Sequence, residues 1–279
     1  MSAYVAPEAD FGPARTLRLG LSRVRYEVRS YFRQLDSVFF TFLFPVLFLL
    51  IFAVAFASQN FGPPGHTIGS AQFYLPGMLA AGLLLSGLQN MSLDIAMERS
   101  DGTLKRLGGT PLGPAAYFIG KIGQVFVTGA LQSALLIVVA GVAFGVPLPT
   151  DPARWATFAW VFLLGVTTCA VLGIGLSALP RSGRSATGVV VPIVLVLQFV
   201  SGVYIDFAAL PTWLQNVASV FPLKWLAQGL RSVFLPESFA AGETVGSWQL
   251  PEVALVTGLW LVFGLAVVRV SFRWIRRDT

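Results

Sequence analysis

Residues 38–57 read VFFTFLFPVLFLLIFAVAFA, an apolar run without a single Asp, Glu, Lys, Arg or His. Five further runs share this lack of charge and occupy residues 73–93, 122–144, 155–179, 186–205 and 253–268. A helix needs roughly 20 apolar residues to cross a hydrocarbon layer of ~30 Å, and most of the six runs are that long. The sequence therefore predicts an all-α polytopic membrane protein with six transmembrane helices.

The overall composition supports the same fold class. Hydrophobic residues make up 55% of the chain and charged residues only 11%, whereas a soluble domain carries roughly 25% charged residues. We therefore divide the chain into a polar N-terminal segment, residues 1–37, and a membrane domain, residues 38–279. The first segment is rich in arginine and the apolar run that follows is too long for a leader, so we expect no cleavable signal peptide.

The distribution of basic residues predicts the topology. If the six runs alternate across a membrane, 16 of the 19 Lys and Arg residues lie on one side and three on the other. Such an excess marks the cytoplasmic side, so we expect a cell-membrane protein with both termini in the cytoplasm. The net charge of +6 then reflects topology and attraction to anionic lipid headgroups, and no nucleic-acid partner is expected.

The segment before the first run has the pattern of an amphipathic helix. Its apolar residues recur at spacings of three and four, at Leu17, Leu21, Val24, Val28, Tyr31 and Leu35. On a helix, arginines cluster on a neighbouring flank, namely Arg15, Arg18, Arg25, Arg29 and Arg33. An apolar stripe edged by arginines predicts a helix that lies in the headgroup plane of the membrane. A solvated helix whose charges only enforce topology is the alternative.

A charged segment separates the second and third runs. Residues 94–121 read DIAMERSDGTLKRLGGTPLGPAAYFIGK. Gly102 and the pair Gly108-Gly109 interrupt any helix, which leaves room for only a short helix over residues 103–107. Thr110-Pro111 then resembles a cap and first turn leading into the third run. A short charged helix between glycines is suited to docking on a partner, while an ordinary solvated loop is the alternative.

Few polar residues fall inside the apolar runs. Gln124, Thr128 and Gln132 share one stripe of the third run because they are spaced four residues apart, and Asn90 and Gln198 mark the second and fifth runs. These five residues are candidates for a substrate path. Hydrogen bonding between neighbouring helices is the competing interpretation, since such bonds contribute about 0.6–2 kcal/mol in membranes.

The absence of charge from the runs disfavours several classes of function. An ion-coupled secondary transporter commonly uses a carboxylate inside the membrane, and the six runs contain none. A membrane-embedded enzyme needs a nucleophile with a base, or metal ligands. His66 is the only histidine and Cys169 the only cysteine, so we predict no catalytic residue and no metal site. A non-transporting membrane scaffold remains open, as does secondary transport.

Two motifs give the chain a family resemblance. The string Glu98-Arg99-x-x-Gly102-Thr103-Leu104, followed by Thr110-Pro111-Leu112, resembles the signature of ABC-2 type transporter permeases. A looser match, containing Leu210-Pro211 and Phe221-Pro222-Leu223, is similar to the segment before the last helix in drug- and lipid-exporting members. The resemblance covers nearly the whole chain.

The resemblance implies a specific division of labour. In such permeases the loop between spans two and three is a coupling helix that docks in a groove of a separate ATPase, which would make Glu98, Arg99, Gly102, Thr103 and Leu104 docking residues. Two ATPase copies would serve two permease subunits, expected as a homodimer in membrane lipid, and would drive export of a drug, natural product or lipid by alternating access.

ATP and Mg²⁺ would bind the ATPase, and this chain would bind no cofactor, since it lacks the phosphate-binding sequence G-x-x-x-x-G-K-[ST]. Residues 211–234 would form a pair of short outer helices that dip back into the membrane.

Overall fold

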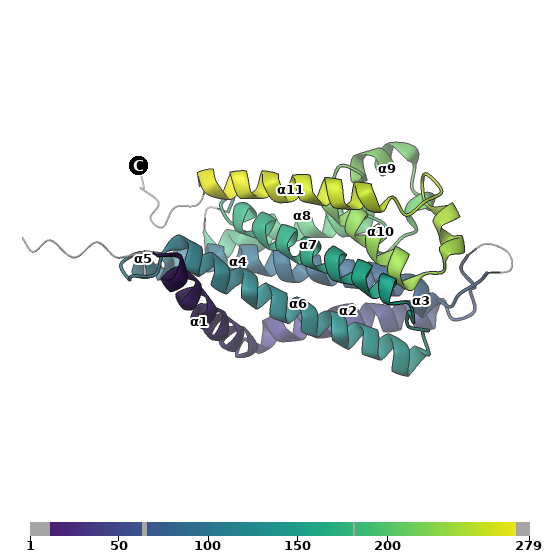
Figure 1. Cartoon of the computed structure of the whole chain (residues 1–279), viewed down its shortest axis with the longest axis horizontal. Coiled ribbons are helices and arrows are strands. Elements are labelled where there is room, and N and C mark those ends of the chain that lie inside the picture. The colour runs from purple at the N-terminus through teal and green to yellow at the C-terminus, as the bar shows by residue number, and fades with distance from the viewer. Residues whose placement is uncertain (1–11, 63–65, 181, 272–279) are drawn as a thin grey trace, which may run out of the picture.

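The computed structural model describes residues 12–62, 66–180 and 182–271, and all of its regular elements are helical. Six of its helices are long and apolar enough to cross a membrane and run side by side along the long axis of the molecule (Figure 1). They are α2 (Leu35–Ala55), the continuous helix Ser70–Ser100, α6 (Pro114–Phe144), α7 (Pro152–Leu176), α8 (Gly183–Val200) and α11 (Leu250–Ser271). The predicted polytopic class with six spans is confirmed.

Shorter helices gather at the two ends of this bundle (Figure 1). One end, called here the α5 end, carries α1 (Pro13–Phe32) and α5 (Thr103–Gly108). The opposite end carries η2 (Phe207–Ala209), α9 (Thr212–Ala218), α10 (Pro222–Phe234) and η3 (Glu237–Gly242). The helix pair predicted over residues 211–234 is therefore present. Nearly every residue of α10 is buried, because α10 packs against α3, α7 and α11.

The second span is the central helix of the bundle. It consists of α3 (Ser70–Leu84), η1 (Leu85–Asn90) and α4 (Met91–Ser100), and every residue of α3 except Phe73 is buried. Small residues allow its neighbours to approach closely, as they commonly do between membrane helices. A Cβ atom added to Gly173 of α7 would lie 2.2 Å from the carbonyl oxygen of Gly87, so α7 and η1 touch backbone to backbone.

The middle of the second span is a π-helix, in which each hydrogen bond reaches one residue further than in an α-helix. Ser92, one turn beyond it, donates its hydroxyl to the carbonyl oxygens of Leu88 and, at 2.9 Å, Gly173. The helix then continues to Ser100, beyond the boundary predicted at residue 93, and the third span begins at Pro114, before the boundary predicted at residue 122. These two spanning helices therefore do contain charged residues, at the α5 end.

Three different faces divide the surface of α1. Leu17 and Leu21, from the predicted apolar stripe, are 54% and 60% exposed, while Arg18, Arg25 and Arg29 are exposed on the predicted basic flank. A third face, with Gly20, Glu27 and Tyr31, is buried, and Gly20 lies directly on Ile119 of α6. The periodicity of apolar residues revealed only part of this face, because Tyr31 belongs to the predicted stripe but Gly20 and Glu27 follow no apolar pattern. The location of α1 at a membrane interface stays a prediction.

Candidate functional site

The short helix α5 is set off from its neighbours by glycine. Gly102 has a φ of +79°, a left-handed conformation that costs an L-residue about 1–2 kcal/mol. Asp101 then accepts a hydrogen bond from the backbone N–H of Thr103 at 2.8 Å. Arg106 donates to the Thr103 hydroxyl at 2.9 Å across the following turn. The structure thus confirms the predicted short helix between glycines and shows that its first turn is fixed by its own side chains.

The two sides of α5 differ in character. Leu104 is 1% exposed and packs in a core cluster with Ile95 and Tyr117. Lys105 and Arg106 are exposed, whereas Gly102 and Thr103 are partly buried. Among the predicted docking residues, Leu104 therefore anchors the helix from inside. The outward surface is made by Lys105 and Arg106, which the sequence motif did not single out although both are visible as charges within it.

Glu98 lies at the centre of a buried ionic network under α5. Its Oε1 atom is 2.7 Å from the ammonium group of Lys121, and its Oε2 atom accepts a 2.6 Å hydrogen bond from the Tyr117 hydroxyl. Lys121, whose side chain is 3% exposed, also pairs with Glu27 at 3.0 Å. Glu27 in turn accepts a 2.7 Å hydrogen bond from Arg23. The network joins α1, α4 and α6.

The contacts within this network determine the structural role of Glu98. A buried charge is costly unless it is paired and hydrogen-bonded, and removing one partner of a buried pair typically destabilises a protein by about 3–5 kcal/mol. Both carboxylate oxygens of Glu98 are engaged inside the protein. Glu98 therefore supports α5 from behind, and its contact with a partner chain stays a prediction.

Arg99 connects the same end of α4 to α7. Its Nη1 atom donates to the carbonyl oxygen of Ser177 at 2.6 Å, just beyond the last turn of α7. Cations are favourable at this position because the last carbonyl groups of a helix are unpaired and carry partial negative charge. Gly183, the first residue of α8, packs against Met97 and Ser100 of α4. The end of α4 is thus held by α1, α6, α7 and α8 together.

A polar cavity of about 470 Å³ opens beside the network. Residues of α1, α4 and α6 and the beginning of α8 line it, and its charged members are Glu27, Asp94, Glu98, Asp101 and Lys121. Tyr31 also lines it and donates its hydroxyl to the carbonyl oxygen of Ser37 at 3.2 Å. Burial raises the pKa of Tyr31 to about 12, so this hydroxyl stays protonated as a donor.

The five residues predicted as a substrate path contact other parts of the same subunit. Gln124, Thr128, Gln132 and Gln198 are at most 5% exposed. Asn90 donates to the Thr41 hydroxyl at 2.8 Å, Thr128 donates to the Gln124 carbonyl at 3.1 Å, and Gln198 accepts from Tyr204. Gln132 packs against Gly82, and its amide has no hydrogen-bond partner among the described residues. This placement favours the packing interpretation. Only Gln124 also lines the polar cavity, and a role in transport stays a prediction.

Comparison with known proteins agrees with this architecture. Residues 22–235 match the family model described as ABC-2 type transporter. A Cyanophora paradoxa protein named as a transport permease, ycf38, is 28% identical over 206 residues, which are 70% of this chain and 67% of that protein. The Escherichia coli proteins YbhR and YbhS, named as multidrug ABC transporter permeases, are 25% and 24% identical over 67% and 74% of this chain.

This chain spans about half the length of the two Escherichia coli relatives. The family match, by contrast, covers well over half of this chain and extends from α1 through α10. It therefore includes α5, the ionic network beneath it and five of the six spans. The chain belongs to the ABC-2 type transporter family, whose members are membrane subunits of ABC transporters and imply an ABC ATPase as partner.

Proposed function

We propose that this chain is the permease subunit of an ATP-driven exporter in the cell membrane, with α5 and both termini on the cytoplasmic side. Two such subunits, as a homodimer surrounded by lipid, would pair with two copies of a separate ABC ATPase that binds ATP and Mg²⁺. One observation carries the proposal. The short helix α5 presents Lys105 and Arg106 outward while Leu104 and the buried Glu98–Lys121 pair hold it to the spanning helices.

This arrangement suits α5 to act as a lever. When the ATPases close on ATP, they would displace α5, and α4 would move with it because only Asp101 and Gly102 separate the two helices. The Glu98–Lys121–Glu27 network would pass the displacement on to α6 and α1, and Arg99 would pass it on to α7. The spanning helices of each subunit would then move together and open a path between the subunits to the outside.

The cargo we propose is a hydrophobic or amphipathic molecule such as a drug, natural product or lipid. The relatives named as multidrug ABC transporter permeases support this class. The charged residues of the described spanning helices lie near their ends, so the middle of the membrane offers an apolar environment to such a cargo.

Co-purification tests the proposal. The tagged chain, expressed with an ABC ATPase encoded beside its gene, should retain that ATPase at one-to-one stoichiometry after gentle solubilisation. We expect Lys105→Glu to weaken this complex at least tenfold, because it reverses the charge on the outward surface of α5. The matched control is Arg33→Glu, which reverses an exposed charge in the turn after α1. Equal retention of the ATPase by both variants would contradict docking through α5.

A second experiment separates docking from transmission. We expect Gly102→Ala to leave the ATPase bound but to abolish the change in its hydrolysis rate on complex formation, because strain at φ +79° would reorient α5 relative to α4. Transport into inverted vesicles should then require ATP and persist when the proton and sodium gradients are collapsed. Transport that survives without ATP but stops with the gradients would favour the ion-coupled alternative.

A further inference from the structure

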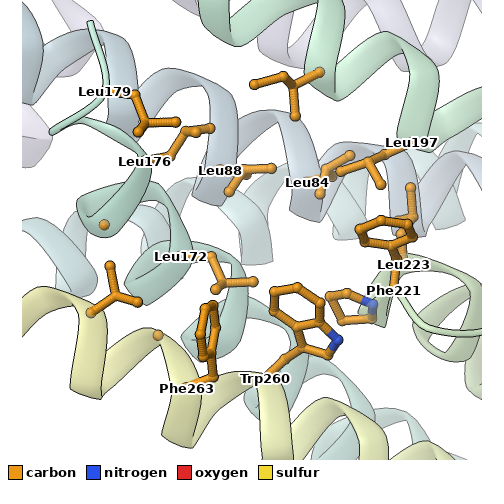
Figure 2. Close-up of a pocket in the computed structure, with 15 residues that line it drawn as sticks. Leu84, Leu88, Leu172, Leu176, Leu179, Leu197, Phe221, Leu223, Trp260 and Phe263 are labelled. Carbon is orange, nitrogen blue, oxygen red and sulfur yellow. The ribbon is translucent and has the colours of Figure 1, made fainter.

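An apolar groove lies on the side of the bundle between α8 and α11, away from the network under α5. Figure 2 shows its wall: Leu197 of α8 on one side, Phe263 of α11 on the other, and Leu84 and Leu88 of the central helix behind. Its volume is about 300 Å³. Among the described residues no charged side chain lines it, and the indole N–H of Trp260 is already donated to the carbonyl oxygen of Val220 at 2.7 Å. The groove therefore offers no hydrogen bond to a ligand.

The groove opens sideways, toward the surroundings of two spanning helices. Two residues that line the groove are also exposed at the surface: Phe263 of α11 is 56% exposed and Ile193 of α8 is 38% exposed. The neighbouring outer residues, Val196 and Val262, are apolar and more than half exposed. A membrane protein meets hydrocarbon rather than water on such a face, and an apolar cavity does not hold ordered water. Its occupant must therefore be apolar itself.

The two ends of the groove are different. Toward the opposite end of the bundle it is closed by Phe221, which stacks on Trp260 with ring centres 5.9 Å apart. Toward the α5 end it extends to Leu179, which is 63% exposed. Arg184 lies in the first turn of α8 and Arg269 in the last turn of α11, so both helices that border the groove carry an exposed arginine at the α5 end. Neither arginine has a hydrogen bond or ion pair with another described residue.

From this geometry we propose that the groove holds one acyl chain of an anionic phospholipid from the membrane leaflet at the α5 end. The chain lies between α8 and α11 with its methyl end against Phe221, and the headgroup phosphate lies within reach of Arg184 and Arg269. Charge complementarity selects an anionic headgroup. The occupant is a lipid of the bilayer itself, and its binding requires neither ATPase nor cargo.

Photo-crosslinking tests the proposal on the full chain in nanodiscs. The probe is phosphatidylglycerol with a diazirine near the end of one acyl chain, diluted into phosphatidylcholine. We expect cross-links to concentrate on the segments that line the groove beside Phe221, namely residues 221–223, Leu197 of α8 and Trp260 of α11. Leu197→Trp, which fills the groove, should reduce them at least fivefold, while the control Val196→Trp, on the outer face of α8, should not. The double variant Arg184→Gln/Arg269→Gln should cross-link equally to the phosphatidylglycerol probe and to a phosphatidylcholine probe with the same diazirine.

A second measurement covers the case in which Leu197→Trp fails to fold. Brominated acyl chains quench nearby indoles, so we expect the quenched fraction of the fluorescence to fall in Trp260→Phe relative to wild type. Photo-labelling that is uniform over all exposed helices, and equal in Leu197→Trp and Val196→Trp, would overturn the proposal. So would cross-links between two permease chains at α8 and α11, because the groove would then be covered by a second copy.

Discussion

The two ends of the bundle hold their charges in different ways. At the α5 end, Lys121 bonds to Glu98 and Glu27, so one ammonium group joins three helices that are far apart in the chain. At the opposite end, Arg231 pairs with Glu243 only 12 residues later, and Trp248 donates to Glu237 only 11 residues earlier. The ion pairs of the α5 end thus join separate helices of the bundle, whereas the ion pair of the opposite end lies within the segment between α8 and α11.

This difference indicates at which end ion pairs would transmit a movement from one helix to another. A displacement of α5 must be shared by α1, α4 and α6, because separating them would leave buried charges unpaired. At the opposite end, α10 is held by its packing against α3, α7 and α11, and no ion pair among the described residues joins it to a spanning helix. The basic residues of the two ends also differ in their exposure. Arg154 at the opposite end donates to the carbonyl oxygens of Val233 and Leu235, whereas the arginines of α1 at positions 18, 25 and 29 are exposed.

The largest effect should follow from Lys121→Met, which removes the cation shared by two buried carboxylates. We expect the free energy of unfolding to fall by about 3–5 kcal/mol, because Glu27 and Glu98 would lose their common partner. Titration with SDS from mild detergent micelles measures this change. The double variant Lys121→Met/Glu98→Gln should recover part of the loss. A loss below 1 kcal/mol would show that the three helices are not joined through this residue.

Arg231→Met is the equivalent change at the opposite end. It breaks a partly buried pair with Glu243, and a hydrogen bond to a charged group contributes about 1.5–3 kcal/mol. We expect a loss in that range in the same titration, with unchanged stimulation of ATP hydrolysis in the complex. If Arg231→Met uncoupled hydrolysis as strongly as Lys121→Met, the contrast between the two ends would not hold.

Gln132→Met tests the middle of the bundle, between the two ends. Both amide atoms of Gln132 are buried without a partner among the described residues. Replacing an unsatisfied polar group with an apolar side chain of similar size should be neutral or stabilising by about 1 kcal/mol. Thermal unfolding in detergent measures this change. Wild-type transport in the variant would support packing, whereas lost transport with unchanged stability would place Gln132 on a substrate path.

The smallest effect on folding is expected for the triple variant Arg18→Gln, Arg25→Gln and Arg29→Gln. All three side chains are exposed, so the free energy of unfolding should change by less than about 1 kcal/mol. Basic residues close to an anionic surface contribute about 1 kcal/mol each to its attraction. Activity should therefore fall in anionic lipid but not in zwitterionic lipid. Equal activity of the variant and wild type in anionic lipid would leave α1 only a topological role.

The sequence was sufficient to predict the spans and α5, because hydrophobic length and glycine positions act locally. The predicted runs at residues 38–57 and 155–179 overlap α2 and α7 almost completely. The ends of the second and third spans were predicted less well. Charged residues usually end a spanning helix, but here Glu98 and Lys121 neutralise each other, so both helices continue past them.

The ionic network could not be predicted from the sequence. The elements α2, α3, η1, α4 and α5 lie between Glu27 and Lys121 in the chain, and no periodicity relates the two positions. The face of α1 that contacts α6 was missed because it combines Val24, a member of the predicted apolar stripe, with Gly20 and the Glu27–Lys121 ion pair, which follow no apolar pattern. The exposed Lys105 and Arg106 were visible in the sequence, but only the burial of Leu104 shows which side of α5 faces outward.

The wide turn at η1 has a consequence for how the two ends are oriented about the axis of the second span. A π-turn corresponds to one additional residue in an α-helix, and one residue amounts to about 100° of rotation. The wide turn absorbs that residue, so deleting a single codon within residues 85–90 would restore an uninterrupted helix with Glu98 still facing Lys121. A deletion within Ser70–Leu84 would instead rotate the start of the span relative to Glu98 by about 100°.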